Sequence, residues 1–465
     1  MFLQIVLRVM KNVAFTNVQL FDGKVDSDLI PNATILVELE IKGKNGVIEG
    51  KIKEIGSSGQ VSIQEDFKIV DLAGKYVIPG LINVHCHLTG SGKPMTAMQG
   101  SERKMKFIQW FLNTRLGESY INKQMRINVQ AALNSGVTTI RDAGDPCYYD
   151  IGVKKEIEEG DIIGPRLVCA GRSICVTGGH GELVSHIIDG PWEGRKAVRD
   201  CLRHGSDVIK ILSTGGVTDS KKLGEAGRPQ MTTEEIAAIC DEAHRAGVKV
   251  MTHCESTLGI KEALEGGVDS IEHGAPITED LIELFKNNPK SLNGYTTLVS
   301  TLSAAQDICE LGAEVLKVTH IIQKNGVIIL EGMIEGMKTA VKNDIPMAMG
   351  TDAAVPFVAH YEFWKELIYY QHFGGISNKR AINIATEQNA KLLGIDDVTG
   401  ALEVGKSADF VVYEGNPLED LMVLENPVHV VYRGNLIKKP TYKKVKELEK
   451  YADKRFFSKL MKEKQ

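Results

Sequence analysis

After Pro79 and Gly80 the chain carries a run of apolar, β-prone residues that ends in His85-Cys86-His87. Successive side chains of a strand point to opposite faces, so His85 and His87 project to the same side. Two imidazoles on one side of a strand end can bind a single divalent ion. A His-x-His pair can equally be a surface pair or a buried structural pair, so ligand candidates elsewhere in the chain decide between these interpretations.

The chain before Pro79 differs in texture from the chain after it. Short alternating runs at residues 13–21, 33–41, 52–55 and 68–72 are separated by Gly, Asn and Asp turns, which predicts a small antiparallel β unit. After Gly80, strands alternate with amphipathic helices, which is typical of βα repeats and a parallel sheet. We therefore expect a domain boundary near Pro79.

Eight candidate strands follow, the number that a TIM barrel requires. They are residues 77–85, 138–142, 166–171, 207–212, 248–253, 270–273, 294–299 and 346–350. Helix signals lie between and after them, at residues 121–134, 232–246 and 386–393. Active sites of such barrels lie at the carboxyl ends of the strands, where most of the polar signals of this chain fall.

After Gly400 the chain returns to β texture, with runs at residues 408–413 and 428–435. These runs are expected to complete the N-terminal sheet. The predicted fold is therefore α/β, a (β/α)₈ TIM barrel with a small discontinuous β-sandwich domain built from both chain ends. The expected segments are residues 1–79 and 401–440 for the sandwich, 80–400 for the barrel, and 441–465 for a basic helical tail on the surface.

Composition excludes several classes of partner and compartment. A net charge of -5 gives no reason to expect nucleic acid, and no run of 18 apolar residues indicates a membrane span. The apolar residues 1–9 are too short to span a bilayer and, since Met10 could itself be a start, are either an upstream extension or an added strand. The eight cysteines form no Cys-x-x-Cys pair, which favours reduced thiols and a cytoplasmic protein.

Four further predicted strand ends carry candidate metal ligands: Lys210, His253, His273 and Asp352. A buried lysine is unfavourable unless it is neutralised or paired, so Lys210 is either a functional residue or part of a structural salt bridge. Cys86 and Cys254 lie next to candidate ligands, but strand alternation turns both away from a metal ion held by their neighbours.

Four motifs give the chain its resemblance to a known family: residues 79–87, Ser-Ile-Glu-His-Gly at 270–274, Gly-Thr-Asp at 350–352, and residues 402–410. With these motifs the chain resembles the amidohydrolase superfamily, metal-dependent hydrolases built on a (β/α)₈ barrel. The resemblance implies a binuclear site with two divalent metal ions, zinc by default. It implies His85 and His87 as ligands of one ion, His253 and His273 as ligands of the other, Asp352 as a further ligand, and Lys210 carboxylated to a bridging carbamate.

The same resemblance implies hydrolysis of a C–N amide bond, in which the metal ions activate water and polarise the carbonyl. Asp352 would act as general base and then as general acid. Two positions depart from the family pattern. Asn83 stands where an aspartate is common, and Glu255 stands where an aromatic residue or a histidine is usual.

Residues 137–142, Gly-Gly-His-Gly at 178–181 and residues 207–216 resemble a subgroup, the imidazolonepropionase-related or Xaa-Pro dipeptidase (prolidase-like) metal-dependent carboxypeptidases. This implies an enzyme that acts on a small molecule, a dipeptide or an N-acyl amino acid, and a homo-oligomer. His180 would hydrogen-bond a substrate carboxylate or an oxyanion, unless it only caps its own loop.

Three weaker candidates for substrate binding are Tyr295, Arg141 and Glu255. Tyr295 lies in the seventh predicted strand, and Arg141 near the end of the second, where it could equally pair with Asp142 or Asp145. Glu255 would favour a basic substrate side chain if it faces the pocket.

Two alternatives remain open. A mononuclear cyclic-amide hydrolase or deaminase, similar to imidazolonepropionase, would use the histidines and Asp352 without a bridging lysine, and such deaminases tend to carry His-x-x-Glu rather than the His253-Cys254-Glu255 of this chain. A non-catalytic assembly protein that shares the barrel is disfavoured because all six ligand positions are filled.

Overall fold

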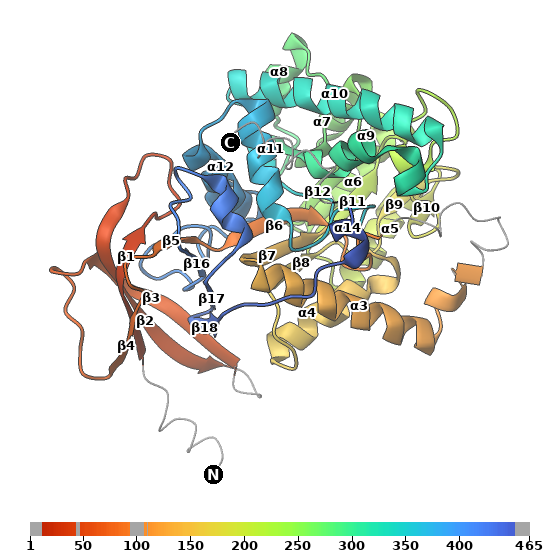
Figure 1. The fold of residues 1–465 in the computed structure, drawn as a ribbon. Coiled ribbons are helices and arrows are strands. Elements are labelled where there is room, and N and C mark those ends of the chain that lie inside the picture. Colours follow the sequence, from red (N-terminus) through yellow and green to blue (C-terminus); the bar gives the residue numbers. More distant parts are fainter. Residues whose placement is uncertain (1–11, 43–46, 94–106, 109, 452–465) are drawn as a thin grey trace.

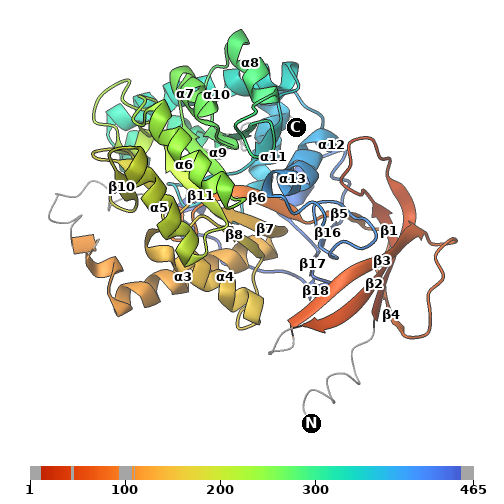
Figure 2. The ribbon, with the colours of Figure 1, turned by 180° about the vertical axis from the view of Figure 1, so that it is seen from behind.

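The computed structural model describes residues 12–42, 47–93, 107–108 and 110–451. Figures 1 and 2 show a helix-covered body of strands beside a smaller sheet in which both ends of the colour range, red and blue, meet. The expectations for residues 1–9, and for the tail after residue 451, lie outside the described residues. Within the described ranges, no helix is long and apolar enough to cross a membrane.

In the part of the chain that the structure describes, eight parallel strands form the larger body. They are β6 (Leu81–Cys86), β7 (Val137–Asp142), β8 (Arg166–Cys169), β11 (Val208–Leu212), β12 (Lys249–Cys254), β13 (Ser270–His273), β14 (Thr297–Ser300) and β15 (Met347–Met349). Asp207 N donates to Cys169 O at 2.8 Å between the β8 and β11 edges. Thr351 N and Asp352 N donate to His85 O at 3.0 and 2.8 Å and close β15 onto β6. The predicted (β/α)₈ barrel is confirmed, with a short parallel pair, β9 (Ile174–Val176) and β10 (His186–Ile188), added after β8.

Helices cover the outside of the barrel (Figures 1 and 2). They are α3 (Arg115–Asn134), α4 (Tyr149–Glu159), α5 (Pro191–His204), α6 (Thr233–Arg245), α7 (Thr257–Gly266), α8 (Glu279–Lys286), α9 (Leu302–Leu316), α10 (His320–Lys342), α11 (Phe363–Gly374), α12 (Asn378–Asn383) and α13 (Asn389–Leu393). Helix α6 starts at a capping box, in which Thr232 and Glu235 satisfy each other's backbone N–H groups. The helix predicted over residues 386–393 begins instead as a π-helical turn, Ile384–Gln388, that leads into α13.

The smaller sheet is built from both ends of the chain. It contains β1 (Asn12–Leu20), β2 (Ile30–Lys42), β3 (Val47–Ser57), β4 (Phe67–Asp71), β5 (Tyr76–Pro79), β16 (Phe410–Tyr413), β17 (His429–Tyr432) and β18 (Asn435–Lys438). Strand β16 pairs antiparallel with β5, which joins the two ends. Because side chains of β1 alternate, Phe15 packs in one apolar cluster with Phe410, and Ala14 packs in another with Phe67. The predicted discontinuous β domain is confirmed, although the run at residues 428–435 contains β17 alone and a further strand, β18, begins at its last residue.

Gly350 determines how closely β15 approaches β6. A Cβ atom at this position would lie 2.4 Å from the Cβ of His85 and 2.8 Å from its backbone N. Any side chain would therefore push β15 away from the strand that carries the first two histidines. Asn389 reinforces the same contact, because its side chain bonds Met349 N, Met349 O and Ile82 O.

We predict that Gly350→Ala lowers the free energy of unfolding by about 1 to 3 kcal/mol, because overpacking of this contact forces the strands apart. Urea denaturation of the purified protein measures the change. The matched control is Gly152→Ala in α4, where an added Cβ meets no atom within 4 Å. The control is expected to have the free energy of unfolding of the wild type or a slightly higher one. A Gly350→Ala variant as stable as the control would contradict the prediction.

Candidate metal centre

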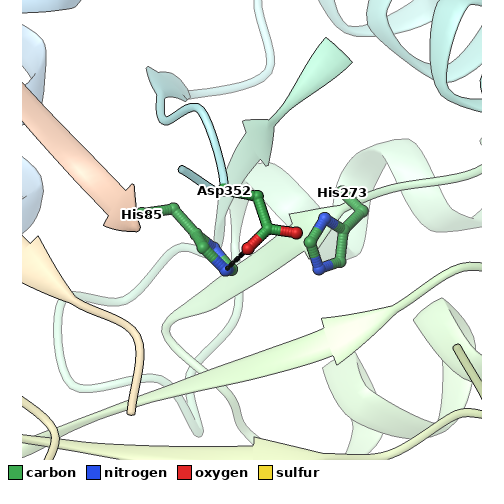
Figure 3. A group of neighbouring side chains, drawn as sticks. All are labelled: His85, His273 and Asp352. Atoms are coloured by element: carbon green, nitrogen blue, oxygen red, sulfur yellow. Dashed lines mark ion pairs between the residues drawn. The ribbon is translucent and has the colours of Figure 1, made fainter. Parts of the chain in front are cut away.

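Polar side chains from several strands converge at the carboxyl end of the barrel. His85 comes from β6, His273 ends β13, and Asp352 follows β15 (Figure 3). Asp352 Oδ1 lies 3.6 Å from His85 Nε2 and 3.4 Å from His87 Nε2. Two atoms that each bind one metal ion at about 2.1 Å lie about 3.4 Å apart in tetrahedral geometry. His85 Nε2 and Asp352 Oδ1 are buried and have no hydrogen-bond partner among the described residues, so this donor set fits a metal ion.

Each of these histidines is oriented by a partner at its other nitrogen. His85 Nδ1 lies 2.6 Å from Glu272 Oε2, and His273 Nδ1 lies 2.7 Å from Thr301 Oγ1. His87 Nδ1 donates to Gly144 O at 2.6 Å. Such partners fix the ring and leave Nε2 free to bind a metal ion.

The backbone at two of these positions is left-handed. His273 has φ 67° and Asp352 has φ 57°, a region that non-glycine residues seldom occupy. Residues held in this way are found at functional sites, where the surrounding structure maintains the conformation. Here the hydrogen bond of Asp352 N to His85 O holds the carboxylate against the first histidine.

Arg141 has a different place from the one expected. Its side chain is 3% exposed, and its guanidinium donates to both carboxylate oxygens of Glu272 at 2.9 and 3.0 Å and to Val84 O at 2.6 Å. It therefore pairs with Glu272 inside the barrel, rather than with Asp142, Asp145 or a substrate. The Glu272 carboxylate joins this buried cation to His85.

The predicted position of Tyr295 within the seventh strand is also wrong. Strand β14 starts at Thr297, and the Tyr295 carbonyl accepts a hydrogen bond from Ser291 in the turn before it. Tyr295 thus lies at the amino end of the strand, whereas the metal-ligand candidates lie at the carboxyl ends. The structure does not bring it to the site.

Lys210 lies in the middle of β11 and is 2% exposed. Among the described residues no carboxylate forms an ion pair with its ammonium. Burial lowers the pKa of Lys210 to about 8, against the opposing charges of Glu272 and Asp352. Because the neutral amine is the form that reacts with carbon dioxide, this environment suits carboxylation.

The rings of His253 and His180 continue the group of histidines beyond His273. The ring of His253 lies 4.6 Å from that of His273 and 4.5 Å from that of His180. His180 Nδ1 lies 2.7 Å from Asp219 Oδ2. Burial raises the pKa of Asp219, but His180 and hydrogen-bond donors outweigh it and lower this pKa to about 2. A charged Asp219 therefore orients His180, with room for the ring because position 216 is glycine.

Glu255 faces this group of histidines. The residue is 9% exposed, and its Oε2 lies 3.7 Å from His253 Nε2 without a hydrogen-bond partner among the described residues. Ligand atoms of His253, Glu255 and His273 all lie within 4.8 Å of one another. A second group with three possible ligand atoms is thus formed beside the first.

Several residues that support the site were not predicted from the sequence: Glu272, Thr301, Asp219 and His360. His360 Nε2 donates to His87 O at 3.0 Å, and burial lowers the pKa of its imidazole to about 4, so the ring is neutral. Glu272 directly precedes His273, and this adjacency was the one available signal. Asn83, noted as a departure, bonds Thr351 through both its amide atoms and so links β6 to the segment that carries Asp352.

Comparisons with known proteins bear on the family and the fold. A family model described as "Amidohydrolase family" matches residues 76–437. A solved structure of a candidate prolidase from Bifidobacterium longum has a TM-score of 0.80 and 34% identity, over 95% of this chain and 98% of that one. A Xaa-Pro dipeptidase with methionine bound in its active site has a TM-score of 0.78 and 29% identity, over 92% of this chain and 100% of that one. Ochratoxinase from Aspergillus niger is 28% identical over 340 residues, 66% of this chain and 67% of that protein.

We predict that Lys210→Met stabilises the protein when chelator and bicarbonate-free buffer keep metal and carbon dioxide away. A lysine pKa lowered from 10.5 to about 8 destabilises the folded state at pH 7 by about 3 kcal/mol, and methionine removes that charge. In the wild type this destabilisation is fully present below pH 8, where Lys210 is protonated in both the folded and the unfolded state. It disappears as pH rises from 8 to 10.5, because in this range the folded protein has lost the proton and the unfolded chain still binds it.

Urea denaturation at pH 7 and pH 9.5 measures both effects. Lys210→Met is expected to be the more stable protein at pH 7, with a smaller advantage at pH 9.5. The control Lys338→Met changes an exposed lysine on α10 and is expected to behave as the wild type. A Lys210→Met variant less stable than the wild type at pH 7 would show that Lys210 is stabilised by a partner.

Proposed function

Because this chain belongs to the amidohydrolase family and is therefore a hydrolase of carbon–nitrogen bonds, we propose that it is a binuclear metal-dependent enzyme that hydrolyses dipeptides or N-acyl amino acids. The observation that carries the proposal is Lys210, a fully buried lysine among His85, His273 and Asp352 with no ion pair in the described structure. A carbamate on this residue would replace the buried cation by an anion that suits two metal ions.

The donor groups divide between two ions, with zinc as the default metal. His85, His87 and Asp352 would hold the first, His253 and His273 the second, and carboxylated Lys210 would bridge them. When bound, the ions would supply water activation near neutral pH and polarisation of the scissile carbonyl.

The residues of the chain perform the remaining steps. Asp352, whose Oδ1 is fixed against His85 and His87, would take the proton from the attacking water on its other carboxylate oxygen and deliver it to the leaving nitrogen. His180, oriented by Asp219, would donate from its free nitrogen to the substrate carboxylate or to the developing oxyanion. The similarity to a Xaa-Pro dipeptidase and a candidate prolidase supports a substrate with an amide bond to an amino acid.

We predict near two metal equivalents per chain for protein purified with bicarbonate and without chelators, and fewer for Lys210→Ala, which lacks the bridge. Elemental analysis measures the content. A parallel screen of Xaa-Pro, basic and apolar dipeptides and of N-acyl amino acids is expected to find the substrate. One metal equivalent that does not depend on Lys210, together with turnover of cyclic amides or aminated heterocycles, would favour the mononuclear alternative. The chain also has sequence similarity to an imidazolonepropionase from Clostridium tetani, which is the kind of enzyme that this alternative describes.

We predict that Asp352→Asn lowers turnover of the substrate so found by at least about 100-fold, because the amide cannot accept the proton. Its metal content should remain nearly that of the wild type, since the histidines and Lys210 are unchanged. Asp397→Asn, at an exposed position, is the matched control and should keep full activity. Retained activity in Asp352→Asn would remove the assigned role.

A further inference from the structure

We propose that Glu255 is a third protein ligand of the metal ion held by His253 and His273. The inference rests on the proposed metal-dependent function and adds a residue to that site. It replaces the expectation that Glu255 selects a basic substrate side chain.

The backbone of Glu255 is held in place. The residue directly follows β12, and its backbone N donates to Thr214 Oγ1 at 3.1 Å. Its carbonyl oxygen lies 2.5 Å from where a Cβ of Gly227 would be, so a neighbouring loop packs closely on it. These contacts fix the point from which the side chain extends toward His253.

The distances suit a shared ion. Two atoms bound to one metal ion at about 2.1 Å lie between about 3.0 Å, at a right angle, and about 4.2 Å, on opposite sides. Glu255 Oε2 lies 3.7 Å from His253 Nε2, inside this interval. Two histidines and a glutamate are also a donor set that catalytic zinc sites use.

The Glu255 carboxyl group has an unused ligand atom. Its Oε2 is buried and has no hydrogen-bond partner among the described residues, and a buried polar atom without a partner is unfavourable. A cationic substrate group placed against Oε2 would lie beside His253 and the metal ion that this ring holds, and like charges repel. The metal ion itself is the cation that fits.

This assignment gives the second ion three protein ligands in addition to the bridge from Lys210. His253 lies in β12, Glu255 directly follows that strand, and His273 ends the adjacent strand β13, which pairs with β12. Loss of Glu255 should weaken this ion and leave the ion at His85, His87 and Asp352 in place.

The test compares Glu255→Gln, which keeps the shape but removes the charge, with Glu265→Gln, a matched control at an exposed position on α7. Zinc affinity is measured by competition with a chromophoric chelator, and the coordination of the second site by the visible absorption of the cobalt-substituted protein. We expect Glu255→Gln to bind the second ion at least tenfold more weakly, with an altered cobalt spectrum. The control should match the wild type in both measurements.

Glu255→Asp separates ligand loss from damage to the fold, because it restores a carboxylate one methylene shorter. It should bind the second ion more tightly than Glu255→Gln, at the same thermal stability. The inference is overturned if Glu255→Gln binds both ions with wild-type affinity and an unchanged cobalt spectrum, and the binuclear proposal then still stands. If the wild type binds one ion and Glu255→Gln loses it, the binuclear proposal is overturned and the role of Glu255 as a ligand is supported. If the wild type binds no ion, both proposals are overturned.

Discussion

The closure of β15 onto β6 is the contact on which the site depends. His85 O accepts hydrogen bonds from Thr351 and Asp352, and Gly350 leaves no side chain between the two strands. The last barrel strand therefore reaches the first at the point where the histidines begin. A carboxylate and an imidazole that are far apart in the sequence become neighbours because a barrel has to close.

Beneath this contact the barrel interior contains buried charges. Glu272 accepts from Arg141 on one side and orients His85 on the other, which satisfies a carboxylate that is fully buried. Lys210 has no such ion pair in the described structure, and burial lowers its pKa. The paired charges of Arg141 and Glu272 are thus structural, whereas the buried Lys210 without an ion pair is a candidate for chemical reaction.

Much of the architecture follows from the sequence because its causes are local. Strand alternation and the barrel rule were enough to expect His85, His87, Lys210, His253, His273 and Asp352 at strand ends or within strands of one barrel. The eight strands overlap the expected ranges, although the first predicted run is divided between β5 and β6. Partners across the barrel were not predictable, since the pairing of Arg141 with Glu272 depends on the register of strands that are not adjacent. Tyr295 was misplaced because the turn before β14 continues three residues further than the β-prone pattern indicates.

The joining of β5 with β16 has a consequence for how the molecule forms. Strand β5 pairs with β1 on one side, whereas its neighbour on the other side, where Phe410 pairs with Pro79, comes from a segment that follows the whole barrel in the sequence. Contacts of such large sequence separation close long loops and form slowly. The smaller sheet is therefore complete only after the barrel with all six expected ligands has been added to the chain, so its two halves assemble around a barrel that already exists in sequence.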